Sequence, residues 1–309
     1  MNVNEIFKAQ LTRIPKPGVG ANYHTFIYGL ACRGHEAGLS DDVIFTAIRN
    51  HTPDGGRMIS DREIEDAVQN SKLAKDRTIV PYSGPRIRPD FLSECLHNGK
   101  GATMDDIAAR SPVKLDWNEE DGWRALSYLY DDDELLFIGD DRTPGVLGSS
   151  IRTCEDWCAD FELEDPSDPK IIVNPLTGVA APKKAGVGET LRGDGCISSA
   201  RFAVAESDSL SLEDQCAFWM GCPSLPVAAL IFSGSKSVHA WLRVDCADPA
   251  DWERRIAGEL FPGFLVPIGM DASCKNPARL SRMPGYYRQD KDTVQRLIYL
   301  APDGKAVSA

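Results

Sequence analysis

Glu206 and Asp208 are two acidic residues at the end of an apolar stretch that predicts a strand. Two later stretches of the sequence also place polar side chains next to a predicted strand. Residues two apart in a strand share a face, so the alternation before them predicts that the two carboxylates stand side by side. Carboxylates that close repel each other unless they share a proton or hold a cation. Hard oxygen ligands suit Mg²⁺ or Mn²⁺, which makes the pair a candidate metal site; the alternative is a strand that ends in solvent at Glu206.

The second stretch predicts a hairpin. Residues 227–232 are apolar and predict a buried strand, residues 233–236 (Ser-Gly-Ser-Lys) predict a tight turn, and residues 237–245 alternate between apolar and polar. The alternation puts Ser237 and His239 on one face, next to a turn that contains Ser235 and Lys236. Backbone N–H groups in such a turn can hold phosphate, and Lys236 adds positive charge. The other interpretation of His239 is an imidazole that is packed or lies on the surface.

The third stretch places one acid before a group of cations. Asp271 follows an apolar run over residues 264–270, and Lys275, Arg279 and Arg282 come soon after it. This order suits a metal-bound triphosphate, because the acid can take the metal while the cations take the phosphates. Taken alone, the stretch also fits a solvated loop with ordinary charges.

Together the three stretches resemble the archaeo-eukaryotic primase superfamily, the primase-polymerases. The pattern of that family is an acidic pair on a strand, then Ser-x-His on a later strand, then a single acid. Here His239 lies 31 residues after Asp208, and Asp271 lies 32 residues after His239. The flanking residues look most like primases carried by phages, plasmids and other mobile elements. One departure is Glu206, where many relatives have Asp, although a Glu carboxylate can also ligate a metal.

The resemblance implies a DNA primase or primase-polymerase that performs template-directed nucleotidyl transfer to start or extend chains on single-stranded DNA. It implies that two divalent ions, Mg²⁺ or Mn²⁺, are held by Glu206, Asp208 and Asp271, with His239 also in the catalytic set. The residues implied to contact nucleotide phosphates or the template backbone are Ser235, Lys236, Ser237, His239, Arg279 and Arg282. The implied partners are a single-stranded DNA template and nucleoside triphosphates. The sequence contains no GxxxxGK[ST] motif, so a replicative helicase would be a separate chain.

Two other functions fit parts of the pattern. Clustered acids with a histidine also serve a metal-dependent nuclease or phosphodiesterase, which would degrade DNA without nucleoside triphosphates. A non-catalytic replication-initiation module that binds nucleic acid is the third hypothesis. Such a module would not need the three acids.

Composition narrows the setting of the protein. The net charge of −12 argues against strong non-specific binding to duplex DNA, but residues 271–296 hold six Lys or Arg against three acids. No apolar run approaches the roughly 18 residues of a membrane span, and the N-terminus shows no signal peptide, so we expect a cytoplasmic protein. The nine cysteines are scattered, which favours free thiols.

The predicted fold class is α+β. Residues 1–78 predict a small helical bundle that resembles the accessory domain of mobile-element primases, and residues 79–90 predict a linker. Residues 91–309 would form the primase-polymerase catalytic domain, with an N-terminal half (91–200) and an RRM-like half (201–309) that carries the acidic triad. Within them we expect a hairpin over residues 125–138, helices that begin after Ser211 and Asp248, and a closing strand over 293–300. The second half would bury one face of its sheet and leave the other for the site.

Overall fold

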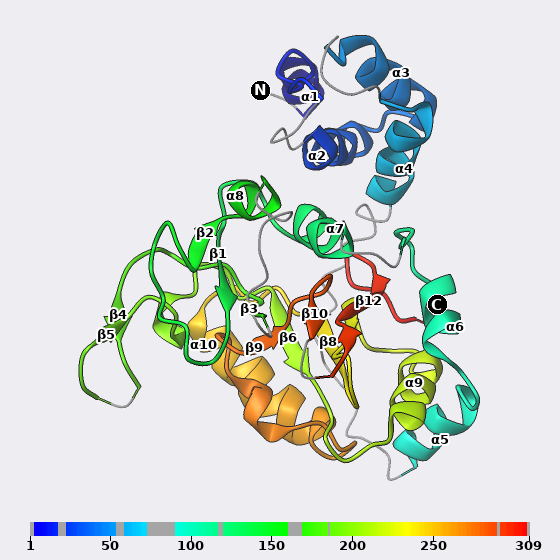
Figure 1. The fold of residues 1–309 in the computed structure, drawn as a ribbon. Helices are drawn as coiled ribbons and strands as arrows, with labels where there is room; N and C mark the ends of the chain where they lie inside the picture. The colour runs from blue at the N-terminus through cyan, green and yellow to red at the C-terminus, as the bar shows by residue number, and fades with distance from the viewer. Residues whose placement is uncertain are drawn as a thin grey trace.

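The computed structural model describes residues 3–17, 23–53, 59–72, 90–116, 120–159, 169–184, 186–288 and 291–307. It combines helices with antiparallel sheets, in agreement with the α+β expectation. Figure 1 shows the N-terminal helices grouped together at one end of the molecule and the sheets grouped at the other. Among the described helices, none is both long and apolar enough to cross a membrane.

The N-terminal group contains the helices α1 (Val3–Leu11), α2 (Tyr23–Glu36), α3 (Asp41–His51) and α4 (Asp61–Lys72). They share a core of their own, because the stripe that includes Tyr23, Ile27 and Leu30 packs against buried residues of the other helices. Tyr28 also meets Tyr128 edge to face, with ring centroids 5.8 Å apart, where α2 approaches the second group. The predicted linker, apart from Asp90, lies outside the described residues, and the division into domains stays a prediction.

The main sheet has four antiparallel strands in the order β12-β7-β8-β6. Their bounds are β6 (Phe202–Ala205), β7 (Val227–Phe232), β8 (Val238–Arg243) and β12 (Arg296–Leu300). Side chains of β8 alternate between two cores: Ala240 points toward one, and Trp241 points toward the other. Strand, helix, hairpin, helix and strand follow one another as predicted, whereas the RRM-like character of the arrangement stays a prediction.

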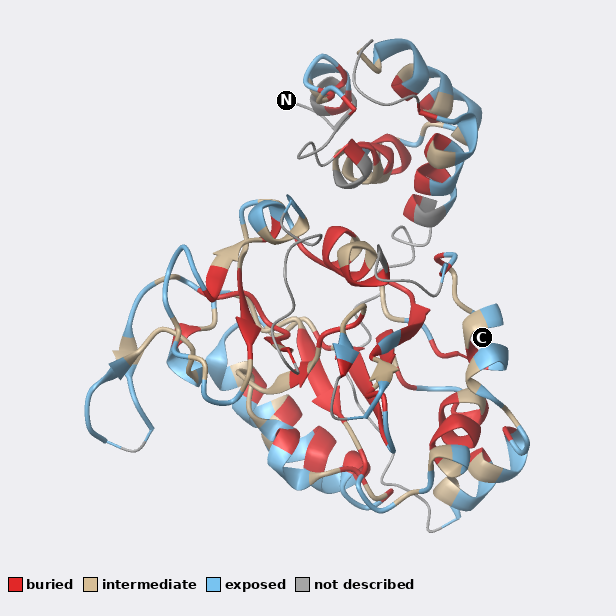
Figure 2. Cartoon of the chain, viewed as in Figure 1, coloured by how far each residue is buried: buried red, intermediate tan, exposed pale blue. Residues whose placement is uncertain are grey.

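Both faces of the main sheet are covered, as the buried strands in Figure 2 show. One face packs against α5 (Phe91–Asn98), α9 (Leu212–Gly221) and η3 (Trp252–Leu265), a helix with wider π-type hydrogen bonding that continues α10 (Pro249–Asp251). The other face packs against α7 (Glu120–Leu129) and a second sheet. The expectation that a whole face is left for a site is therefore wrong.

The second sheet joins the two predicted halves. Its order is β2-β1-β3-β9, and its strands are β1 (Leu135–Gly139), β2 (Ile151–Thr153), β3 (Lys170–Ile172) and β9 (Leu280–Arg282). β9 comes from the C-terminal half but pairs with β3, with Ile171 opposite Ser281. The smaller elements are α6 (Met104–Ala109), α8 (Cys154–Ala159), β4 (Ala181–Pro182), β5 (Glu189–Thr190), η2 (Asp194–Cys196), η4 (Ala272–Lys275), β10 (Tyr287–Arg288) and β11 (Thr293–Val294).

The local predictions had mixed outcomes. The helices after Ser211 and Asp248 are confirmed, and each of these residues caps its helix with its side chain. The hairpin over residues 125–138 is wrong, because its first arm is the helix α7. Ala125, Leu126 and Leu129 are all buried, a helical spacing that was mistaken for a strand. All nine cysteines are free thiols, as expected.

A close crossing of α5 and α9 generates a prediction about stability. A Cβ atom added at Gly221 would lie 2.0 Å from the carbonyl oxygen of Cys95, so neither backbone can accommodate it without moving. Gly221→Ala should therefore lower the free energy of unfolding by roughly 3 kcal/mol, a cost typical of overpacking. Urea denaturation measures this change. Gly263→Ala is the matched control, because a Cβ there meets nothing within 4 Å, and it should cause no loss.

Candidate active site

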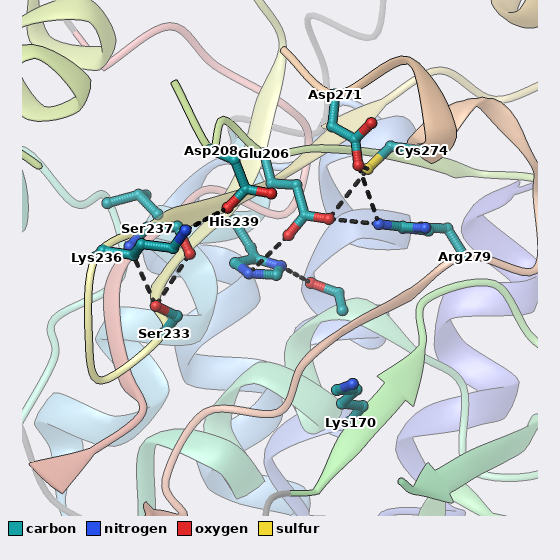
Figure 3. Close-up of polar contacts among 12 residues, drawn as sticks. Lys170, Glu206, Asp208, Ser233, Lys236, Ser237, His239, Asp271, Cys274 and Arg279 are labelled. Carbon is teal, nitrogen blue, oxygen red and sulfur yellow. Dashed lines mark hydrogen bonds and ion pairs between the residues drawn. The ribbon is translucent and has the colours of Figure 1, made fainter. Parts of the chain in front are cut away.

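Glu206 stands at the point where β6 ends. The ladder pairs Val204 with Trp241 and Ala205 with Ala240, so the next position brings Glu206 opposite His239 on the same face of the sheet. The Oε2 atom of Glu206 lies 2.9 Å from Nε2 of His239, and the two side chains are only 15% and 7% exposed. Figure 3 shows this pair at the centre of the site.

The second ring nitrogen of His239 is held by the other sheet. Nδ1 lies 3.3 Å from Oγ of Ser281, and that oxygen accepts a hydrogen bond of 2.8 Å from the indole N–H of Trp241. Because an indole nitrogen only donates, the hydroxyl hydrogen of Ser281 is free to point at Nδ1, and Nε2–H then points at Glu206. Both ring nitrogens are engaged, so His239 orients Glu206 in this structure, and its predicted contact with phosphate stays a prediction.

Asp271 is brought to Glu206 by the segment after η3. Its backbone N–H donates to the carbonyl oxygen of Glu206 over 2.8 Å. Its carboxylate caps η4, where it accepts from the backbone N–H of Ser273 over 2.8 Å and from its hydroxyl over 2.5 Å. Two acids 65 positions apart in the sequence are thus fixed next to each other by backbone as well as side-chain contacts.

Arg279 and Cys274 converge on these two carboxylates. A terminal nitrogen of the Arg279 guanidinium lies 2.5 Å from Oε1 of Glu206 and 3.5 Å from Oδ2 of Asp271. The thiol of Cys274 faces the same oxygens, at 3.3 Å from Oε1 and 3.9 Å from Oδ2. Cys274 is fully buried and was not predicted as a site residue, because a cysteine in an apolar position looks like part of the core.

The charges of the site are set by these contacts. Burial alone would raise the pKa of Glu206, but hydrogen bonds from His239, Arg279 and Cys274 lower it well below its ordinary value. Hydrogen bonds from the hydroxyl and backbone N–H of Ser273 lower the pKa of Asp271. Burial and the neighbouring Glu206 raise the pKa of Cys274. The site therefore holds two ionised carboxylates and a neutral thiol at neutral pH.

Asp208 does not continue the strand. β6 ends at Ala205, and the hydroxyl of Ser207 then turns the chain by accepting from the backbone N–H groups of Ser209 (3.3 Å) and Leu210 (3.1 Å). The prediction that Glu206 and Asp208 share a strand face is therefore wrong. Asp208 instead pairs with Lys236 over 3.0 Å, and both side chains are 72% exposed. Its predicted role as a metal ligand stays a prediction.

The predicted turn between β7 and β8 is present. Gly234 has a φ of 77°, which favours glycine, and Ser233 N–H donates to the carbonyl oxygen of Ser237 over 2.9 Å. Ser235 and Lys236 are exposed, whereas the hydroxyl of Ser237 turns inward and donates to Oγ of Ser233.

A buried glutamine holds the turn between β7 and β8 in place. Gln215 of α9 supports the turn, since its amide binds the carbonyl oxygen of Lys236 over 3.1 Å and accepts from the N–H of Val238 over 2.8 Å. Sequence reasoning missed it, because a buried glutamine in a helix shows its role only through tertiary contacts.

Arg282 lies on β9 next to Ser281, so alternation directs its side chain to the opposite face of that strand. Its predicted contact with phosphate or the template backbone stays a prediction.

The donor atoms fit a divalent cation in part. Among the described residues, Glu206, Asp271 and Cys274 offer ligand atoms that all lie within 4.8 Å of one another. Two carboxylate oxygens suit Mg²⁺ or Mn²⁺, and a sulfur donor favours softer ions over Mg²⁺. Asp208 is not in this group, so two of the three predicted acids meet here.

Comparison with known proteins gave one likeness. No family model and no curated protein matches the chain. A solved structure of the AEP domain of the cyanophage S-2L primase-polymerase (PrimPol) is similar to it, with 18% sequence identity and a TM-score of 0.38. The likeness covers 62% of this chain and 96% of that one.

The lowered pKa of Glu206 predicts how stability depends on pH. A depressed carboxylate contributes stability above its ordinary pKa of 4.5 and loses it as the pH falls through the folded value. Glu206→Gln should therefore be less stable than wild type at pH 7, and this gap should shrink steadily as the pH falls below about 4.5. Urea unfolding at several pH values measures the gap. In Asp208→Asn, which loses an exposed ion pair, little change is expected at any pH, and a constant gap for Glu206→Gln would contradict the assignment.

Proposed function

We propose that this chain is a primase-polymerase, a nucleotidyltransferase that starts or extends chains on a single-stranded DNA template. The observation that carries the proposal is the meeting of Glu206 and Asp271, two ionised carboxylates fixed at the end of a sheet, with Arg279 between them. Such a centre suits a metal-bound triphosphate, because it combines oxygen ligands with a cation for phosphate.

The chain's own residues would divide the work as follows. Glu206 and Asp271, and Asp208 by the sequence resemblance, would hold divalent ions, Mg²⁺ or Mn²⁺, which supply charge stabilisation of the triphosphate and activation of the attacking hydroxyl. His239 keeps the Glu206 carboxylate oriented and ionised. The exposed turn with Ser235 and Lys236 would bind phosphates through its backbone N–H groups and the exposed ammonium of Lys236.

The wider setting of the proposal comes from the sequence resemblance. It favours a role in replication of a mobile element, with a separate helicase as partner. The N-terminal helices would then serve as an accessory domain. Arg282 would contact a nucleotide phosphate or the template backbone, as the resemblance implies.

Substitution of the two central acids tests the proposal. Glu206→Gln and Asp271→Asn should each lower template-dependent nucleotide incorporation by on the order of 10²-fold or more, because each removes a carboxylate that would hold the divalent ion against the reacting phosphates. The assay contains single-stranded DNA, Mg²⁺ or Mn²⁺, and ribo- or deoxyribonucleotides, with and without a primer. Glu213→Gln, which neutralises an exposed acid on α9, is the matched control.

The same assay separates the alternatives. Wild-type synthesis that both variants lose supports a polymerase, and products without an added primer make it a primase. Shortening of the DNA without nucleotides would instead establish a nuclease. Asp208→Asn decides whether the third acid belongs to the centre: a loss as large as that of Glu206→Gln would include it, and unchanged activity would exclude it.

The turn between β7 and β8 gives a separate kinetic prediction. Lys236→Gln should raise KM for the nucleoside triphosphate several-fold and change kcat less, because an exposed ammonium at a phosphate site contributes mainly to binding. Added salt should weaken wild-type binding more than that of the variant, since exposed charges are screened. Steady-state kinetics at two salt concentrations measure both effects. An unchanged KM at both would remove the turn from the nucleotide site.

A further inference from the structure

A guanidinium occupies the space between the two carboxylates. The terminal nitrogen of Arg279 contacts Oε1 of Glu206 at 2.5 Å and Oδ2 of Asp271 at 3.5 Å. These are also the two oxygens that the thiol of Cys274 faces (Figure 3). A divalent ion bound by Glu206 and Asp271 would need the same oxygens, so Arg279 and the ion compete for one place.

Arg279 makes its ion pairs through a terminal nitrogen of the guanidinium, whereas its Nε has no such partner in the described part of the chain. Its side chain is 27% exposed, and its Nε is buried without a hydrogen-bond partner among the described residues. A buried donor without a partner costs free energy, so this placement depends on the two carboxylates. Phosphate oxygens offer a guanidinium paired acceptors, and they are the group that could draw Arg279 away from the acids.

We propose that Arg279 is an internal counter-ion that keeps the metal site closed until a nucleoside triphosphate arrives. The triphosphate takes over the guanidinium, and the freed carboxylates then bind the divalent ion. This inference rests on the proposed function and adds an order of events to it. Because coupling between two ligands is reciprocal, the nucleotide and the ion should each strengthen the binding of the other beyond their direct contact.

Metal binding without turnover tests this directly. The full chain is titrated with Mn²⁺, and free Mn²⁺ is measured by electron paramagnetic resonance. Arg279→Gln should bind Mn²⁺ on the order of tenfold more tightly than wild type in the absence of nucleotide, a factor typical of coupled sites. Arg279→Lys, which keeps the charge, should lie between the two. Lys100→Gln removes a positive charge from an exposed position outside the site, and it should stay close to wild type.

A non-hydrolysable triphosphate analogue supplies the second arm. After correction for the Mn²⁺ that the analogue holds in buffer alone, it should strengthen Mn²⁺ binding by wild type and have a much smaller effect on Arg279→Gln. Glu206→Gln defines the binding that belongs to this site, and urea unfolding verifies that each variant is folded.

The outcomes separate two failures. If Arg279→Gln binds Mn²⁺ no more tightly than wild type while Glu206→Gln still loses it, the metal site stands and the counter-ion role of Arg279 is overturned. If no Mn²⁺ binding depends on Glu206, with or without the analogue, the metal site of the proposed function falls, and the inference falls with it.

Discussion

The ionised carboxylate of Glu206, withdrawn from most of its water, is the constraint on which the site depends. Burying a charge is costly unless charged or hydrogen-bonding partners replace the lost water. Here the partners come from three places: His239 from the neighbouring strand, Arg279 from the segment before β9, and the thiol of Cys274 from η4. Each of these segments contributes a hydrogen bond that lowers the pKa of the carboxylate. The site is therefore a product of the assembled fold and not of any one segment.

The fold meets this demand by joining its two halves around the end of β6. β9, which belongs to the C-terminal half, pairs with β3 of the N-terminal half. This pairing places Ser281 of β9 next to His239. Asn174, just after β3, completes the connection from the other side. Its amide donates to the carbonyl oxygens of Phe202 and Pro277 and accepts from the N–H groups of Arg201 and Phe202, all at 2.8 Å. A fully buried asparagine with every bond satisfied ties the start of β6 to the segment that delivers Arg279. The side chains of the site thus come from residues 201–309, and the first half helps to place them through β3 and Asn174.

The sequence predicted the elements of this site better than the contacts between them. The strand over residues 227–232, the turn after it and the position of His239 follow from alternation and from Gly234, because those signals are local. The strand was extended too far toward Asp208, since the hydroxyl of Ser207 ends it by a hydrogen bond that apolar alternation does not record. Cys274 was missed for a different reason. Its thiol acts through a contact with Glu206, 68 residues away, and no spacing rule predicts that contact.

The distribution of charge decides whether an acidic chain could accept the phosphate-rich substrate of the proposed function. The net charge of −12 repels polyanions at a distance, but screening at physiological salt confines that field to about 8 Å. The nearby acids are paired: Glu206 and Asp271 of the site share Arg279, and the exposed Asp208 pairs with Lys236. Under the proposed function, an approaching phosphate would meet cations that are already paired. Its arrival would not leave a buried carboxylate alone if a divalent ion entered with it. Exchange of partners, and not net attraction, is then the basis on which this site would select a metal-bound nucleotide over other anions.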